Sequence, residues 1–244
     1  MKKSMTLFTC GLLALALVCG PAQAQTNQEV VAKMIEAQGG AKALAAVKDT
    51  TINATVELVS MGMNGTLTMY QKEPNMMRMD IEIMGMVITQ AYDGAVAWMV
   101  NPQTGATEQM PEPAAQAMKR QALGNGALLT PEKYGIKYEY KGKEKIDAKE
   151  YLLLEQTTAD GHKTTMYLDP GSYLPYKAKG MEIDAQTNTE VMTESVFGDY
   201  RKEGDIMIAH TLTTVRDGQE FMKLAINKVT FNSNLEDSFF KMSK

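Results

Sequence analysis

Methionine is the residue type in this sequence with the clearest capacity for chemistry. The chain has 20 methionines among 244 residues, and nine of them fall between positions 61 and 99. Methionines separated by one residue share a side of an extended strand, an arrangement in which two thioethers could hold Cu(I). The same side chains are flexible and apolar, and such groups line surfaces that accept greasy ligands. The pairs are Met61 with Met63, Met77 with Met79, and Met84 with Met86.

The residues around these pairs favour the apolar interpretation over copper. No histidine lies near any pair, and the alternation that contains Met77 and Met79 continues into Ile81 and Ile83. That pattern predicts a strand with one greasy face. A protein core that is simply rich in methionine is the plainer alternative.

Catalytic motifs are scarce in the sequence. Of two histidines, His162 follows the expected turn at Asp160-Gly161 and is predicted to be exposed. His210 alternates with apolar residues and is predicted to be a hydrogen-bonded residue of a sheet. The sequence has neither a Gly-x-Ser-x-Gly elbow nor the paired histidines of a zinc site. A hydrolase that uses two carboxylates distant in sequence remains an alternative. No feature of the sequence singles out such a pair.

The N-terminus has the pattern of a cleaved export signal. Lys2 and Lys3 precede an apolar run over residues 7–18, which is too short to span a bilayer comfortably. Ala22-Gln23-Ala24 then matches a small-x-small cleavage site. We expect residues 1–24 to be removed and residues 25–244 to form a single domain, exported as a soluble protein to the periplasm.

Cleavage there would also remove Cys10 and Cys19, the only two cysteines. The mature chain would then have no disulfide, thiolate nucleophile or sulfur-based zinc site. A lipid anchor on Cys19 is a weaker alternative, because Val18 is a poor match to the small residue that precedes a lipidated cysteine. The net charge of −4 gives no support to nucleic-acid binding.

The elements that must position these residues are mostly strands. A helix is predicted over residues 26–38, ended by Gly39-Gly40, and a short helix over 41–47. Alternation with a period of two begins at Thr50. About eleven strands follow, interrupted by a helix over 113–123, and they predict a curved antiparallel sheet or open barrel with helices covering the opening. Asn64-Gly65 is predicted to be a hairpin turn, Gly124-Asn-Gly126 to end the mid-chain helix, and residues 142–149 to be a solvated turn.

Four motifs occur in order along the chain: Tyr70-x-Lys72-x-Pro74-Asn75-x-x-Arg78, Ala91-Tyr92-Asp93-Gly94-x-x-x-Trp98, Tyr167-Leu168-Asp169 with Leu174-Pro175, and Phe239-Phe240-Lys241-Met242. Together with the helical opening, they resemble the outer membrane lipoprotein-sorting proteins, the LolA/LolB-like family. The resemblance implies a half-open antiparallel β-barrel of about eleven strands, with N-terminal and mid-chain helices as lids. It also implies an apolar cavity for acyl chains, no cofactor and no catalysis.

On this basis we expect a periplasmic carrier or binder of lipoprotein acyl chains or other lipids, working by reversible burial. A lipid-sensing regulatory module of the same fold is the main alternative, and a methionine-based copper protein is a further one. The expected partners are lipids and proteins of the inner or outer membrane, and the expected state is a monomer. The predicted cavity wall consists of Met77, Met79, Ile81, Ile83, Met86, Ile88 and Trp98.

Overall fold

The protein is built on one antiparallel sheet. The computed structural model describes residues 26–184, 187 and 189–242, so the expected export signal lies outside the described residues. Thirteen strands in this part of the chain follow the order β6-β5-β4-β3-β2-β1-β13-β12-β11-β10-β9-β8-β7. They are β1 (Asp49–Leu58), β2 (Met63–Lys72), β3 (Met76–Ile83), β4 (Met86–Tyr92), β5 (Ala97–Val100), β6 (Thr107–Gln109), β7 (Lys137–Ile146), β8 (Lys149–Thr157), β9 (Lys163–Leu168), β10 (Pro175–Ile183), β11 (Glu190–Glu203), β12 (Ile206–Arg216) and β13 (Gln219–Phe231).

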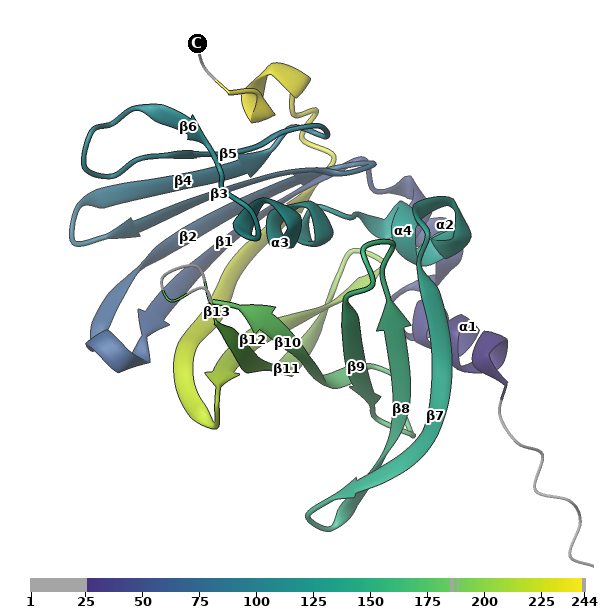
Figure 1. Cartoon of the computed structure of the whole chain (residues 1–244). Helices are drawn as coiled ribbons and strands as arrows, with labels where there is room; N and C mark the ends of the chain where they lie inside the picture. The colour runs from purple at the N-terminus through teal and green to yellow at the C-terminus, as the bar shows by residue number, and fades with distance from the viewer. Residues whose placement is uncertain (1–25, 185–186, 188, 243–244) are drawn as a thin grey trace, which may run out of the picture.

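The sheet is curved but not closed. Strands β6 and β7 are its two edges and do not pair with each other. Strands β1 to β6 form one wall and β7 to β13 the other, with helix α3 between them (Figure 1). The expected half-open antiparallel architecture is therefore confirmed. The helices are α1 (Asn27–Ala37), α2 (Gly40–Ala46), α3 (Ala114–Gln121) and α4 (Asn125–Leu129), with short 3₁₀ turns η1 (Val59–Met61), η2 (Pro131–Tyr134) and η3 (Asp237–Phe240).

Three details differ from the sequence prediction. Asn64 and Gly65 lie inside β2, and the β1–β2 connection is made by η1 with Gly62 in the left-handed conformation. Most of residues 142–149 belongs to the β7–β8 hairpin, which turns at Asp147, where φ is 53°. Asn125 begins α4 rather than ending a helix, because the Glu73 carboxylate accepts the amides of Asn125 and Gly126 and so satisfies the start of that helix.

Each helix covers its own part of the inner face of the sheet. Helix α1 begins at a capping box formed by Thr26 and Glu29 and buries Val30 and Met34 against β8 and β9. Helix α2 buries Leu44 against Ile206 of β12. Helix α3 places Met118 and Ala122 over Met77, Tyr92 and Ala97 of β3 to β5. The helices thus bury the concave side of the sheet in three separate hydrophobic clusters, one for each of α1, α2 and α3.

The outer face near β3 to β5 is covered by the C-terminal segment. The indole Nε1 of Trp98 donates to the carbonyl of Phe240 over 2.8 Å. The Arg78 guanidinium lies 4.5 Å from the Phe239 ring centroid, which is a cation–π distance. Trp98 and Phe240 are 3 % and 0 % exposed. The final turn η3 therefore packs on the side of the sheet opposite to α3 (Figure 1).

Candidate functional site

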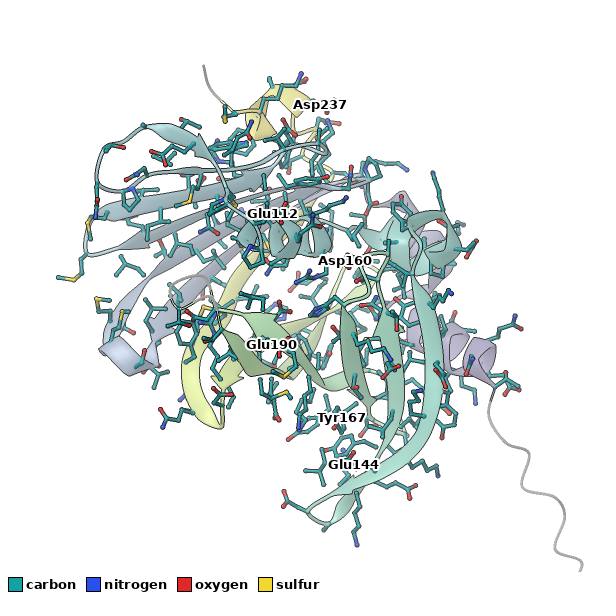
Figure 2. All side chains as sticks on the ribbon, in the orientation of Figure 1. Glu112, Glu144, Asp160, Tyr167, Glu190 and Asp237 are labelled. Carbon is teal, nitrogen blue, oxygen red and sulfur yellow. The ribbon has the colours of Figure 1, made fainter. Side chains whose placement is uncertain are left out.

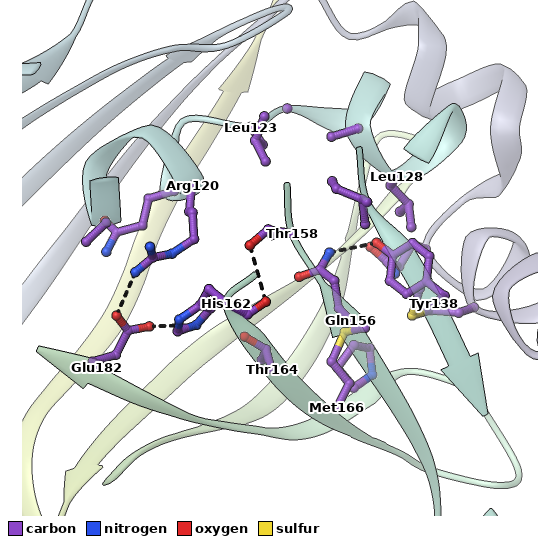
Figure 3. Close-up of a pocket in the computed structure, with 18 residues that line it drawn as sticks. Arg120, Leu123, Leu128, Tyr138, Gln156, Thr158, His162, Thr164, Met166 and Glu182 are labelled. Atoms are coloured by element: carbon purple, nitrogen blue, oxygen red, sulfur yellow. Dashed lines mark hydrogen bonds and ion pairs between the residues drawn. The ribbon is translucent and has the colours of Figure 1, made fainter. Parts of the chain in front are cut away.

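A cavity of about 390 Å³ lies between α3, α4, α1 and strands β7 to β10. This volume is within the usual range of ligand pockets, about 300–1,000 Å³. One end of the cavity is apolar and the other is polar (Figure 3). The apolar end is formed by Met34, Leu123, Ala127, Leu128, Ile136 and Met166, with the hydrogen-bonded pair Gln156 and Tyr138 on the same side, and the polar end by Arg120, Thr158, His162, Thr164 and Glu182.

Helix α3 divides its contacts between two sides because of helical spacing. Met118 and Ala122, four residues apart, face the methionine-rich inner surface of β3 to β5. Ala117, Arg120 and Gln121 face the cavity. The helix therefore packs on one wall of the sheet with one side and forms part of the cavity with the other.

The Arg120 side chain joins α3 to the opposite wall. Its Nη1 donates to Asp160 Oδ2 over 2.8 Å, and its Nη2 donates to Glu182 Oε2 over 3.0 Å. The other Glu182 oxygen, Oε1, lies 3.2 Å from His162 Nε2. In Figure 2, Asp160 lies beside α3. We call Arg120, Asp160, His162 and Glu182 the polar bridge.

The carboxylate of Asp160 is ionised over the whole physiological range. Burial raises the pKa of Asp160, but hydrogen bonds from Thr158 and Arg120 and the Arg120 charge outweigh that effect and lower the pKa to about 2. Thr158 Oγ1 bonds to the same carboxylate. Arg120 thus lies between two carboxylates, those of Asp160 and Glu182.

Neutral polar groups continue the wall beyond the polar bridge. The Gln156 carboxamide donates through Nε2 to the Tyr138 hydroxyl over 2.8 Å. Burial raises the pKa of Tyr138, partly offset by the hydrogen bond from Gln156, so the phenol stays uncharged. The Thr164 hydroxyl and the Gln121 carboxamide have no hydrogen-bond partner among the described residues. These groups remain available to a ligand.

The predicted wall residues divide between the two faces of the sheet. Six share the inner face: Met77 and Met79 pack beneath α3, Ile83 is buried, Ile81 pairs with Ile88, and Met86 is 59 % exposed near the β3–β4 turn. Trp98 does not belong with them, because it pairs with Ala91 and Arg78 in register and faces the C-terminal segment. None of the seven lines the 390 Å³ cavity. Contact of the six inner residues with a ligand stays a prediction.

Little in the sequence points to the residues that form the cavity. His162 was expected to be exposed, yet its side chain is only 15 % exposed because it packs against Glu182. Arg120 stood in a helix with no distinguishing motif. Their meeting depends on the pairing of β9 with β10 and on the position of α3, which local patterns do not specify. His210 is a hydrogen-bonded sheet residue as predicted, 4 % exposed and bonded to the Ile208 carbonyl and Glu203.

The described residues contain no cluster of three or more His, Cys, Asp or Glu arranged to hold a metal ion. Of the methionine pairs, Met77 and Met79 pack beneath α3, whereas Met61 and Met84 are 58 % and 78 % exposed. None of the helices in this part of the chain is long and apolar enough to cross a bilayer.

Solved structures with the same fold include several from bacteria, although no protein-family model and no curated protein sequence matches the chain. A LolA superfamily protein from Nitrosomonas europaea superimposes with a TM-score of 0.59 and 15% identity, over 89% of this chain and 98% of that chain. A domain assigned to an outer membrane lipoprotein-sorting protein of Vibrio parahaemolyticus gives 0.57 and 15%, over 88% and 95%. A DUF1329 family protein from Desulfovibrio piger gives 0.59 and 13%, over 89% and 98%. The resemblance found in the sequence is thus confirmed as a shared fold, because this chain has the half-open antiparallel architecture of these solved structures.

Proposed function

We propose that this protein binds lipid acyl chains reversibly in the cavity beneath α3 and α4. The observation that carries the proposal is a cavity of about 390 Å³, apolar at one end, on the concave side of a LolA-like sheet. Burying one methylene group contributes about 0.8 kcal/mol, so an acyl chain can be held without a strong polar anchor. No catalytic step is part of the proposal.

The proposed location of this activity is the periplasm. The N-terminal pattern of lysines, apolar run and small-x-small site supports export, with residues 25–244 as the working domain. A protein of this kind would receive lipid or a lipidated protein from one membrane and release it at another. Proteins of the inner or outer membrane are accordingly its proposed partners.

The inner face of β3 and β4 supplies a second apolar surface for the same task. Met77 and Met79 now contact Met118 and Ala122 of α3. Helix α3 has only eight residues, and its far side meets the sheet through the polar bridge. If α3 moves outward, these methionines join the cavity and adapt to chains of different shape. In this way the sequence-predicted wall takes part in binding.

Native mass spectrometry of the mature protein, purified without harsh detergent, tests the proposal. We expect co-purified lipid on the wild-type protein. Met166→Gln places an amide at the apolar end, and should lower lipid occupancy at least tenfold. Met61→Gln changes a side chain that is 58 % exposed and should leave occupancy unchanged.

Lipid-free protein that also fails to bind added acyl lipids would contradict the proposal. A transfer assay between donor and acceptor vesicles then separates a carrier from a sensing module. A carrier accelerates transfer in proportion to its concentration, whereas a sensor binds lipid without accelerating transfer.

A further inference from the structure

The polar end of the cavity restricts the kind of head group that a bound lipid can have. We infer that the cavity takes an amphiphile with a single acyl chain and an uncharged, hydrogen-bonding head group, which lies beside the polar bridge. This inference rests on the proposed function and narrows it to one ligand class. The supporting observations are the orientation of the cavity, its charges and its size.

The orientation follows from a second cavity on the outer side of the polar bridge. This outer cavity, of about 330 Å³, shares Ala117, Arg120, His162 and Glu182 with the inner one. Met181 and Ile183, at its border, are 40 % and 39 % exposed. The two cavities therefore adjoin at the polar bridge. A chain whose tail lies at the apolar end and that extends towards the outer cavity places its head group at that point.

The charge of the head group follows from the partners that the polar bridge already has. Both terminal nitrogens of Arg120 donate to carboxylates, those of Asp160 and Glu182. An anionic head would have to displace one of these carboxylates from Arg120 or lie next to Glu182, the one that lines both cavities. Like charges at such distances repel strongly inside a protein. A fatty acid or a lysophosphatidic acid is therefore a poor fit.

A cationic head is also disfavoured. Glu182 already accepts from Arg120 and His162, and Asp160 already accepts from Arg120 and Thr158. Two carboxylates attract a cation, but a cationic head would have to take these oxygens from Arg120, His162 or Thr158 and would be repelled by the Arg120 guanidinium. The groups with spare capacity are neutral: the Thr164 hydroxyl and the Gln121 carboxamide. Hydroxyl and ester groups of a glycerol head can bond to both kinds of side chain.

The number of chains follows from the volume. The inner cavity, of about 390 Å³, lies near the lower end of the usual range of ligand pockets, about 300–1,000 Å³, which favours one chain over two. A second chain would have to lie in the outer cavity beside the polar bridge, or displace α3 from its position over β3 to β5.

Displacement of Nile red, an uncharged dye, from the mature protein at pH 7.5 tests the inference. The probes share a twelve-carbon chain and are used below their critical micelle concentrations: 1-dodecanoylglycerol, dodecanoate, dodecylamine and 1,2-didodecanoylglycerol. We expect 1-dodecanoylglycerol to bind at least tenfold more tightly than dodecanoate or dodecylamine, and at least fivefold more tightly than the diacyl probe. Native mass spectrometry should show one molecule of 1-dodecanoylglycerol per chain.

A Glu182→Gln variant checks that the polar bridge causes the discrimination. It removes one negative charge while keeping the side-chain shape, so dodecanoate should gain at least threefold in affinity while 1-dodecanoylglycerol is little changed. Glu150→Gln alters an exposed residue paired with Lys143 and serves as the control. Equal or tighter binding of dodecanoate, dodecylamine or the diacyl probe to the wild-type protein overturns the inference and leaves acyl binding standing. Failure of all four probes to bind overturns the proposed function as well.

Discussion

Arg120 and Glu182 lie 3.0 Å apart, Nη2 to Oε2, and connect the end of helix α3 to strand β10 across the opening of the sheet. The two residues are 62 positions apart in the sequence. Because α3 also packs on β3 to β5, this ion pair links the two walls of the sheet through one short helix. The mobility of α3, and with it access to the cavity, should depend on this pair.

Replacing Arg120 by methionine should release that connection while keeping much of the apolar stem. We expect ligand dissociation to accelerate at least fivefold and amide exchange in residues 114–121 to increase. The loss of stability should stay near 1 kcal/mol, since the partners are partly exposed. Stopped-flow dye release and hydrogen exchange measure these effects. Arg201→Met, which breaks an exposed pair with Asp199, is the matched control; equal dissociation rates in both variants would refute the role of Arg120.

Acid should weaken the protein through Asp160. The folded pKa, about 2, lies below the ordinary value of 3.8, so the carboxylate stabilises the fold above pH 4 and this contribution disappears as the pH falls towards 2. Solvent screening at this partly exposed site reduces the contribution to about 1 kcal/mol. Urea unfolding at pH 6 and pH 3 should show a smaller loss for Asp160→Asn than for the wild type. An identical loss in both proteins would mean that Asp160 does not couple to folding.

The C-terminal turn should behave as part of the core. Phe240 is fully buried and its carbonyl accepts the indole of Trp98, the single tryptophan of the chain. Phe240→Ala should cost about 3 kcal/mol and shift Trp98 emission to longer wavelength. Lys241→Ala, at an exposed position, should do neither. Because Trp98 faces away from the cavity, ligand binding should leave its emission nearly unchanged, and a large change on binding would argue for a site on the outer face.

Oxidation by hydrogen peroxide should separate the methionines by their packing. Met84, at 78 % exposure, should be converted to the sulfoxide first, whereas Met34 and Met77, at 2 % and 5 %, should react last. Peptide mass spectrometry gives the order. If α3 moves outward as proposed, Met77 should react faster in the Arg120→Met variant, and added ligand should slow it again. Equal rates for Met77 in the variant and the wild type would contradict outward movement of α3.

Gly39 should tolerate no side chain. Its φ is 125°, and a Cβ atom there would overlap the backbone carbonyl of Asp205 in the β11–β12 turn. Gly39→Ala should therefore cost more than 2 kcal/mol, through both the left-handed backbone and the close approach. Gly62→Ala, with positive φ but open space around it, should cost about 1 kcal/mol. Chemical denaturation measures the free energy of unfolding of both variants. Similar losses would show that the close approach to Asp205 does not contribute to the cost.

Local patterns in the sequence were sufficient for most of the architecture. The apolar alternation of β1 and β3 and the capping region of α1 are set by neighbours in the chain, and the structure follows them. The Asn64-Gly65 dipeptide was misleading because Gly65 is required inside β2, where its missing side chain lets the Glu82 carbonyl of β3 approach. Glycine is favoured both in turns and where a neighbouring backbone approaches closely, so its presence alone does not distinguish the two.

The candidate site could not be predicted in the same way. Six of the predicted wall residues share a face because strands alternate, but where α3 packs on that face is decided by Met118 and Ala122 in three dimensions. Trp98 was grouped with them although the β4–β5 pairing places it on the other face. Arg120, His162 and Glu182 meet through contacts between distant elements, and no spacing in the sequence encodes that meeting.

The strand order has a consequence for how this molecule is assembled. Every pairing joins neighbours in the sequence except that of β1 with β13. The meanders β1 to β6 and β7 to β13 can therefore form from local hairpins, and the β1–β13 seam must close a loop of most of the chain, at a large entropic cost. We expect this seam to form late, so that Val56→Ala, a cavity substitution in the seam, mainly accelerates unfolding. Stopped-flow refolding would show whether it slows folding instead, which would place the seam in the folding nucleus.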